Sequence, residues 1–397
     1  MADYVPFIIF LMILAVLLQA ESALTVFYLV IGIFILGLWW NKRAIQLVEI
    51  KRGYDKRAYL GDTIDVKLTI NNKSILPILW LEVKESLPVN LRAGQTVNTV
   101  LSLASKDKKE INYKCKALKR GYYILGPLQA QTGEPLGLIK PEQREFPGDS
   151  ITIYPQIVNL EEFGLPSRSP FGTIKEKNPI FEDTSRTMGK RDYHHGDSIR
   201  RIDWKSTAST GELQVKLFES AIALEIAILL DLNRESYNIK TFFDATELAV
   251  TSAASIAAWG KNHQQPVGLS TNGIDPHMDN KIPPVIPPKK GNGNFINILE
   301  TLARIQPAND IPLDMLLSEN LVNLPWGATV VLISGTINEN HLDQLYQSKK
   351  RGTNPVILLT DRVPLKFDLK SLANHYAIPV YSLRYPKDLK VMVTKKS

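Results

Sequence analysis

Two almost uninterrupted apolar runs lie near the start of the chain. The first, VPFIIFLMILAVLLQA, begins at Val5, and the second, ALTVFYLVIGIFILGLWW, ends at Trp40. The polar residues Glu21 and Ser22 separate them. At about 1.5 Å per residue, the second run spans close to the hydrocarbon core of a bilayer, whereas the first falls somewhat short. Because lipid forces backbone polar groups to bond within their own segment, we predict a transmembrane helical hairpin over residues 1–41.

The segment after Trp40 is rich in positive charge. Its cations are Lys42, Arg43, Lys51, Arg52, Lys56 and Arg57, against the acidic residues Glu49 and Asp55. Because Lys and Arg collect on the cytoplasmic side of membrane helices, we expect cytoplasmic soluble domains, held at the inner or plasma membrane. A signal peptide is the rival interpretation. It is disfavoured because Asp3, and no Lys or Arg, stands before the first apolar run.

Composition places the rest of the chain among globular domains. The length of 397 residues allows two or three domains, and 44% hydrophobic with 22% charged residues excludes global disorder or a fibrous repeat. The single cysteine, Cys115, excludes an intrachain disulfide and a multi-cysteine metal site. A net charge of +7 permits attraction to anionic lipid or nucleic acid but requires neither.

Short segments with period-two alternation follow the apolar runs. Residues 62–72, DTIDVKLTINN, alternate apolar and polar positions and end at a turn signal, Asn71-Asn72. ILWLEVKES, INYKCKAL and GYYILGPLQAQ continue in the same style. We therefore predict a β-sandwich-like domain over residues 42–160. Its sequence has no catalytic constellation, which favours a rigid adaptor or binding module.

The period changes from about residue 220. ALEIAILLDL is a continuous apolar run, typical of a strand buried on both faces, and such runs alternate with helical patterns such as NFINILETLARI. This order predicts an α/β domain with a mostly parallel sheet over residues 220–397. Residues 276–294, PHMDNKIPPVIPPKKGNGN, are rich in Pro and Gly. We expect a surface loop without regular structure there, or alternatively a proline-rich ligand for a partner.

Asp231 directly follows the first apolar run of this domain. Parallel sheets place their sites at the carboxyl ends of strands, and Asp231, Asn233 and Glu235 share the spacing of the metal-ion-dependent adhesion site of von Willebrand factor A domains. Such sites hold Mg²⁺ through an aspartate and two hydroxyl side chains, whereas Asn233 and Glu235 stand here. Gly335 also stands where these domains often supply an acid. We interpret the set as a degenerate site, and expect Asp231 to cap the next helix or to pair with a cation.

Residues 190–220 alternate charges of both signs with aromatic residues. The stretch reads KRDYHHGDSIRRIDWKSTASTGELQVKLFES. Its cations and its aromatic residues, Tyr193 and Trp204, could together bind a nucleic acid. The acidic residues Asp192, Asp197 and Asp203 would repel a polyanion. We therefore favour an internal network of ion pairs within an interdomain segment, residues 161–219.

This stretch also carries a family resemblance. It is similar to the signature of the domain of unknown function 58 family in Tyr193, Gly196-Asp197, Arg200 and Ile202-Asp203-Trp204-Lys205. Residues 120–128, 134–138 and 154–155 resemble the family's upstream motifs, while Ser209 stands where the family usually has arginine. The resemblance implies a membrane-anchored chain with a β domain and a von Willebrand A-like domain. It further implies a MoxR-type AAA+ ATPase as partner, and often a transglutaminase-like membrane protein.

We therefore expect an adaptor that acts through protein–protein contacts in complex assembly or envelope maintenance. The residues expected to carry the interaction are Tyr193, Gly196, Asp197, Arg200, Asp203, Trp204 and Lys205. No P-loop, Gly-x-Ser-x-Gly or HExxH motif occurs, so we expect no enzyme activity and no cofactor, with Mg²⁺ at Asp231 as the exception to test. One alternative is a module that binds a polyanion, either nucleic acid or lipid headgroups, and weakens with salt. Nucleic acid is not the expected partner. The other alternative is a metal-dependent hydrolase.

Overall fold

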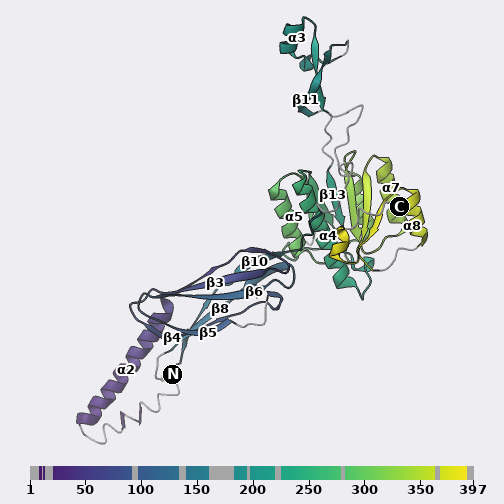
Figure 1. Ribbon diagram of the computed structural model, residues 1–397. Helices are drawn as coiled ribbons and strands as arrows, with labels where there is room; N and C mark the ends of the chain where they lie inside the picture. Colours follow the sequence, from purple (N-terminus) through teal and green to yellow (C-terminus); the bar gives the residue numbers. More distant parts are fainter. Residues whose placement is uncertain are drawn as a thin grey trace. The chain divides into compact units, whose positions relative to one another are not determined.

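The structure is a computed structural model (Figure 1). It describes residues 9–10, 12–13, 21–91, 97–133, 140–160, 183–194, 197–219, 225–278, 282–362 and 367–390. The chain divides into two compact units, Met1–Pro155 and Gln156–Ser397. Each unit is described by itself, and the four-part division expected from the sequence stays a prediction.

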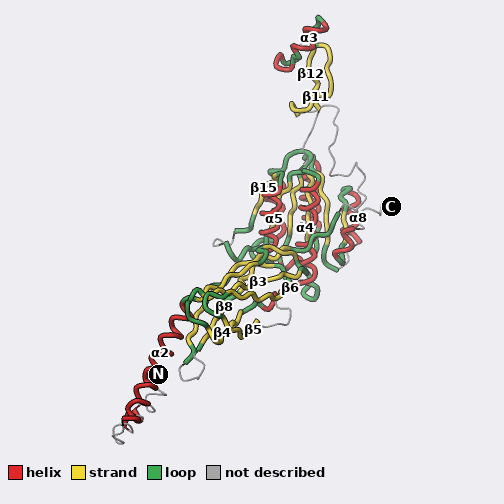
Figure 2. The backbone as a smooth tube through the Cα atoms, turned by 60° about the vertical axis from the view of Figure 1, so that its left-hand side comes forward, coloured by secondary structure: helices red, strands yellow, loops and turns green. Residues whose placement is uncertain are grey.

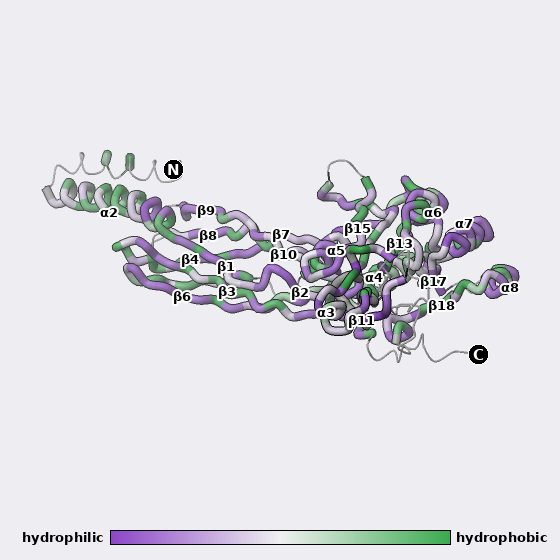
Figure 3. Tube along the Cα trace, turned by 90° about the horizontal axis from the view of Figure 1, so that it is seen from above, coloured by the Kyte–Doolittle hydropathy of each residue, from purple (hydrophilic) through white to green (hydrophobic). Residues whose placement is uncertain are grey.

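The second apolar run forms the long helix α2, Glu21–Gln46. Within the described residues, its part Leu24–Gln46 is the helix that is long and apolar enough to cross a membrane. Much of α2 is coloured as hydrophobic in Figure 3. The first apolar run lies almost entirely outside the described residues, so the expected hairpin stays a prediction.

The end of α2 belongs to the core of the first unit. Ala44 and Ile45 are 1% and 4% exposed and join the same hydrophobic cluster as Val48, which opens strand β1. A single residue, Leu47, separates the helix from that strand. The backbone therefore passes from apolar helix to buried sheet without a linker.

Three sheets make up the rest of the first unit (Figure 1). They are β1 (Val48–Gly53), β3 (Thr63–Asn72) and β6 (Lys108–Lys116); β5 (Val97–Leu103), β4 (Ile78–Glu85), β8 (Leu128–Thr132) and β9 (Glu142–Phe146); and β2 (Arg57–Tyr59), β10 (Asp149–Tyr154) and β7 (Gly121–Leu125). A short 3-10 helix, η1 (Val89–Leu91), follows β4. The alternating residues of β3 and β4 bury Leu68, Ile70, Leu81 and Val83 in one shared core. The period-two pattern of the sequence therefore produces sheets with one buried face.

A charged cluster lies inside this apolar core. The Glu85 carboxylate accepts hydrogen bonds from Arg52 Nε and from the Tyr113 hydroxyl, each at 2.5 Å. Arg52 also pairs with Asp149 at 3.0 Å. Burial, followed by the Glu85 contact, raises the pKa of Tyr113 well above its usual range. The charges of Arg52 and Glu85 satisfy one another, which is what lets the core contain them.

The signature stretch forms a small module of its own. Strand β11 (Asp183–Asp192) pairs antiparallel with β12 (Gln214–Glu219), and between them lie the 3-10 helix η3 (Ile199–Arg201) and the short helix α3 (Trp204–Thr210). We call this module the signature hairpin.

The remainder of the second unit is an α/β domain. Its sheet has the order β15-β14-β13-β16-β17-β18, and all neighbours pair in parallel except β15. The strands are β13 (Ile226–Leu230), β14 (Val267–Thr271), β15 (Val285–Lys289), β16 (Thr329–Ser334), β17 (Asn354–Leu359) and β18 (Val380–Ser382). Every residue of β13, β14 and β16 is buried, as the continuous apolar runs predict.

Helices cover both faces of this sheet (Figure 2). They are α4 (Phe242–Asn262), α5 (Asn292–Arg304), α6 (Leu313–Leu321), α7 (Glu339–Lys350) and α8 (Phe367–His375), with 3-10 helices η4 (Arg234–Ser236) and η5 (Pro386–Lys390). Gly260 of α4 lies directly over Ile226, whereas Leu229 packs with residues of α6, α7 and α8. Because side chains at these two strand positions point to opposite faces, the two groups of helices lie on opposite sides.

The proline-rich segment differs from the expectation. Residues 285–289 of the expected loop form the edge strand β15, antiparallel to β14. An edge strand needs ladder hydrogen bonds on one side only, so Pro287 and Pro288 are tolerated there. The expectation of no regular structure between 276 and 294 was wrong.

Candidate functional site

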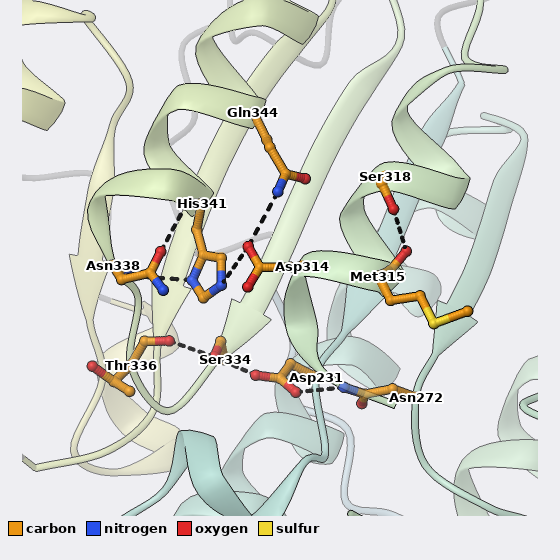
Figure 4. Close-up of polar contacts among 10 residues, drawn as sticks. All are labelled: Asp231, Asn272, Asp314, Met315, Ser318, Ser334, Thr336, Asn338, His341 and Gln344. Atoms are coloured by element: carbon orange, nitrogen blue, oxygen red, sulfur yellow. Dashed lines mark hydrogen bonds and ion pairs between the residues drawn. The ribbon is translucent and has the colours of Figure 1, made fainter. Parts of the chain in front are cut away.

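The carboxyl ends of three parallel strands meet around Asp231. The carboxylate follows β13, Asn272 follows β14, and Ser334 ends β16. Asp231 is fully buried. Its Oδ1 accepts hydrogen bonds from the Asn233 backbone N–H at 3.0 Å and from Asn272 Nδ2 at 2.7 Å, and its Oδ2 accepts one from the Ser334 hydroxyl at 2.6 Å (Figure 4).

Three neutral donors therefore hold the Asp231 carboxylate. The expectation that it caps a helix or pairs with a cation was wrong, because the donors come from neighbouring strand ends. A further contact fixes its backbone: the Tyr237 hydroxyl donates to the Asp231 carbonyl oxygen at 2.5 Å. A buried carboxylate that receives this many hydrogen bonds is held in one orientation.

The residues expected to complete a metal site do not converge on Asp231. Asn233 Oδ1 accepts from the Glu235 backbone N–H at 2.9 Å, and its Nδ2 donates to the Ile311 carbonyl oxygen at 2.9 Å. The Glu235 side chain is exposed. A side chain at Gly335 would collide with the Ser236 carbonyl and the Tyr237 ring. Within the described residues no three His, Cys, Asp or Glu side chains are grouped to hold a metal ion. The residues present therefore do not fit a Mg²⁺ site.

A second aspartate organises the neighbouring loop. Asp361, which is 4% exposed and lies just beyond β17, accepts from the Asn238 N–H at 2.7 Å and from the Thr241 hydroxyl at 2.6 Å. It also accepts from the Arg362 N–H at 2.7 Å. This carboxylate, like that of Asp231, accepts hydrogen bonds from groups of the neighbouring loops.

A histidine–aspartate pair that the sequence reasoning missed lies at the same edge. His341 Nδ1 accepts from the Asn338 N–H at 3.2 Å, so its Nε2 carries the proton that faces Asp314 at 3.3 Å (Figure 4). Asn338 in return caps the His341 N–H. Burial is the main effect on His341 and lowers its pKa, while the charges of Asp314 and Asp231 oppose that effect. The spacing Asn338-x-x-His341 is a capping-box pattern, which could have indicated from the sequence that His341 lies in the first turn of a helix.

Exposed apolar side chains surround this closed network. Ile239 and Phe243, in and after the Asp361-bound loop, are 94% and 72% exposed, and Tyr385 is 57% exposed. Tyr385 lies under the Arg362 guanidinium at 5.6 Å, and Arg362 reaches Asp244, the residue after Phe243, at 3.5 Å. We call Ile239, Phe243 and Tyr385 the apolar rim.

Asp197 is the centre of the signature hairpin. Its two carboxylate oxygens accept from Arg191 Nη1 at 2.7 Å and Nη2 at 2.8 Å, and Oδ2 also accepts from the His194 N–H at 2.9 Å. The Arg191 guanidinium, followed by that backbone bond, lowers the pKa of Asp197 to about 2. This two-pronged ion pair closes the turn between β11 and η3.

Asp203 makes a second closure within the hairpin. Its side chain accepts from the Ser206 N–H at 3.1 Å, which caps α3, and pairs with Lys190 of β11 at 3.0 Å. The Lys190 contact is the main reason that the pKa of Asp203 is lowered. Ser209, in place of the usual arginine, donates to the Ser206 carbonyl oxygen at 2.8 Å within the same helix.

The remaining signature residues differ in exposure. Trp204 is 65% exposed, Lys205 is exposed, and Tyr193 is half-buried with its N–H donating to the Leu213 carbonyl oxygen. Gly196 lies outside the described residues, and only the backbone of Arg200 is described. The aspartates therefore close the hairpin, while Trp204 and Lys205 are presented at its surface.

Comparisons with known proteins cover parts of the chain. The curated "Uncharacterized protein YeaD" of Bacillus subtilis (strain 168) is 23% identical over 265 residues, which are 65% of this chain and 63% of the relative. The chain thus spans less than two thirds of that relative's length.

Among solved structures, proximal thread matrix protein 1 from the mussel byssus has a TM-score of 0.32 at 10% identity, over 43% of this chain and 46% of its own. Native alpha-2-macroglobulin from Escherichia coli has a TM-score of 0.24 at 21% identity, over 28% of this chain and 17% of its own. Scores this low do not define the fold of either unit.

The signature stretch lies within the part of the chain that matches a known family model. Residues 189–365, from β11 of the signature hairpin to the loop beyond β17, match the family model described as "Protein of unknown function DUF58". The match confirms, over residues 189–365, the resemblance to the DUF58 family of proteins of unknown function that the signature carries.

Proposed function

We propose that this chain is a membrane-anchored adaptor that acts through protein–protein contacts, with a MoxR-type AAA+ ATPase as the partner. The observation that carries the proposal is the contrast at the carboxyl edge of the six-stranded sheet. Asp231 and Asp361 have their oxygens bonded internally, whereas Ile239 and Phe243 beside them are 94% and 72% exposed. Such an edge has apolar surface to offer a partner.

The architecture supports this role. In the proposal, the α/β domain is a von Willebrand A-like domain, in keeping with its parallel sheet and single antiparallel edge strand. The first unit is a β-sandwich-like spacer, in keeping with the core that its sheets share. The signature hairpin adds a second contact surface at Trp204 and Lys205.

The anchor is α2, paired with the first apolar run as a hairpin. Cleavage after α2 would remove Ala44 and Ile45 from the core of the first unit, which argues against α2 itself as a cleaved signal peptide. The exposed cations Lys42 and Arg43 favour a cytoplasmic position of both units at the inner or plasma membrane.

The rival functions are less well supported. In the signature hairpin, Arg191 and Lys190 are paired with Asp197 and Asp203, which leaves less positive charge for a polyanion. For the metal-dependent hydrolase, the part of the chain that the structure describes provides no set of converging ligands at Asp231.

The test is affinity purification of the full chain from native membranes in mild detergent, with and without ATP. We expect an AAA+ ATPase to be recovered in an ATP-dependent manner, and Phe243→Ala to reduce that recovery strongly. Val322→Ala is the matched control, because Val322 is 64% exposed and lies just after α6, on the amino-terminal side of β16. Equal recovery with both variants would reject the apolar rim as the contact. Recovery of nucleic acid instead of an ATPase would overturn the adaptor.

A further inference from the structure

The turn between β3 and β4 holds an isoleucine out into solvent. Ile75 is 77% exposed, although Asn72 and Ser74 beside it are 0% and 2% exposed. Asn72 Nδ2 donates to the carbonyl oxygens of Leu76 and Ala104, both at 2.9 Å, and Asn72 Oδ1 accepts from the Ser74 N–H at 3.0 Å. The turn is therefore rigid, and the exposure of Ile75 is built into the fold.

The same turn is fastened to the end of α2. The Trp40 indole N–H donates to the Pro77 carbonyl oxygen at 3.1 Å. On the other side of the turn, the Lys73 N–H donates to the Leu47 carbonyl oxygen at 3.1 Å. Ile75 thus lies in the chain between two residues that are bonded to the end of α2, one to Trp40 and one to Leu47.

Exposed apolar and cationic residues follow the turn in the chain or lie on the helix end and the loop to which it is bonded. Leu79, the second residue of β4, is 55% exposed. Lys42 and Arg43 are exposed on the last turns of α2. Lys106, whose N–H donates to the Ser74 carbonyl oxygen at 3.1 Å, borders the turn on its other side. Apolar tips with lysine and arginine at their edges suit the boundary between lipid headgroups and acyl chains.

We propose that the turn Lys73–Leu76 is a second membrane contact, with Ile75 inserted into the headgroup boundary of the bilayer that α2 spans. The inference rests on the proposed membrane anchor. Aromatic residues at the ends of membrane helices lie at the headgroup level, and the Trp40–Pro77 bond puts the turn at that level. Two contacts, a helix and a turn, define the orientation of the first unit on the membrane, whereas a helix alone would leave it free to rotate.

The test uses cysteine variants of the full chain in vesicles of phosphatidylcholine and phosphatidylglycerol. The native thiol does not interfere, because Cys115 is 1% exposed and burial raises its pKa to about 11. Ile75→Cys carries an environment-sensitive fluorophore. Val89→Cys is the matched control, since Val89 is 76% exposed but follows the opposite end of β4. Leu29→Cys, in the apolar part of α2, reports on the anchor itself.

We expect the label at position 75 to shift to shorter wavelength and to lose most of its fluorescence to a lipid-borne quencher. The label at position 89 should respond to aqueous iodide instead. Lipid quenching at 29 with iodide quenching at 75 would overturn the second contact and leave the anchor standing. Absence of lipid quenching at 29 would overturn the anchor. A label at 75 that is shielded from both quenchers would show a protein neighbour, which also rejects the lipid contact.

Discussion

Arg144 of β9 donates from Nη1 to the carbonyl oxygen of Gln46, the last residue of α2, at 2.7 Å. The same nitrogen also donates to the Val48 carbonyl oxygen at 3.0 Å. Terminal carbonyls of a helix lack partners within the helix, and a cation there also opposes the negative end of the helix dipole. A residue almost a hundred positions away thus bonds to the carbonyl end of α2.

Replacement of Arg144 by methionine should loosen this junction. Arg144→Met keeps an apolar stem but removes the donor, and we expect a loss of about 1–3 kcal/mol in the free energy of unfolding. Denaturant unfolding of the full chain in detergent measures it. Lys109→Met, at an exposed position of β6, is the control and should change little.

Removal of the Asp231 carboxylate should be costly. Asp231→Ala leaves Asn272 Nδ2, the Ser334 hydroxyl and the Asn233 N–H without their acceptor, so we expect a loss of about 2–4 kcal/mol. Thermal unfolding gives the value, and the exposed Glu235→Ala is the control. Added Mg²⁺ should leave the melting temperatures of the native chain and of Asp231→Ala unchanged. A magnesium-dependent rise that Asp231→Ala abolishes would restore the metal site.

The Asp197 ion pair should protect the turn of the signature hairpin. In Asp197→Asn the Arg191 pair is lost, so amide exchange at His194, whose N–H bonds to Asp197, should speed up. Hydrogen-exchange mass spectrometry measures the change. The pKa of Asp197 is lowered from 3.8 to about 2. Its ionised carboxylate therefore stabilises the folded hairpin fully above pH 3.8, and this stabilisation is lost as the pH falls toward 2. Glu212→Gln, exposed just before β12, should leave His194 exchange unchanged.

His341 should make the α/β domain sensitive to mild acid. Its pKa is lowered from 6.5, chiefly by burial, so the folded state holds the neutral ring. The unfolded chain binds the proton first, and stability is therefore lost as pH falls below 6.5 and through the lower folded value. Unfolding curves between pH 7.5 and 5 for the native chain and for His341→Asn should diverge below pH 6.5. Parallel curves would contradict the assignment.

Local patterns were sufficient for much of the fold. Continuous apolar runs around Ile228 and Val331 predict buried parallel strands, and the alternation through Val66 and Leu68 predicts a strand with one buried face. Charge alternation in the signature stretch also indicated internal ion pairing, which the Arg191–Asp197 contact realises. These features depend on neighbours in sequence, which a pattern can capture.

The parts that were missed depend on distant residues. The partners of Asp231 are Asn272 and Ser334, 41 and 103 residues away, and nothing in their local sequence marks them. Phe243 fits a helical core pattern, yet it lies in the first turn of α4 and is 72% exposed. The prolines of β15 favoured a loop in the sequence analysis, because proline has no backbone N–H to donate. An edge strand tolerates this, since it pairs with a neighbouring strand on one side only.

The single residue Leu47 between α2 and β1 has a mechanical consequence. A linker of several flexible residues would absorb a force on the first unit, whereas here one residue joins the helix to the strand. In the proposed anchor, a force on the first unit would therefore reach the bilayer as a change in the tilt of α2.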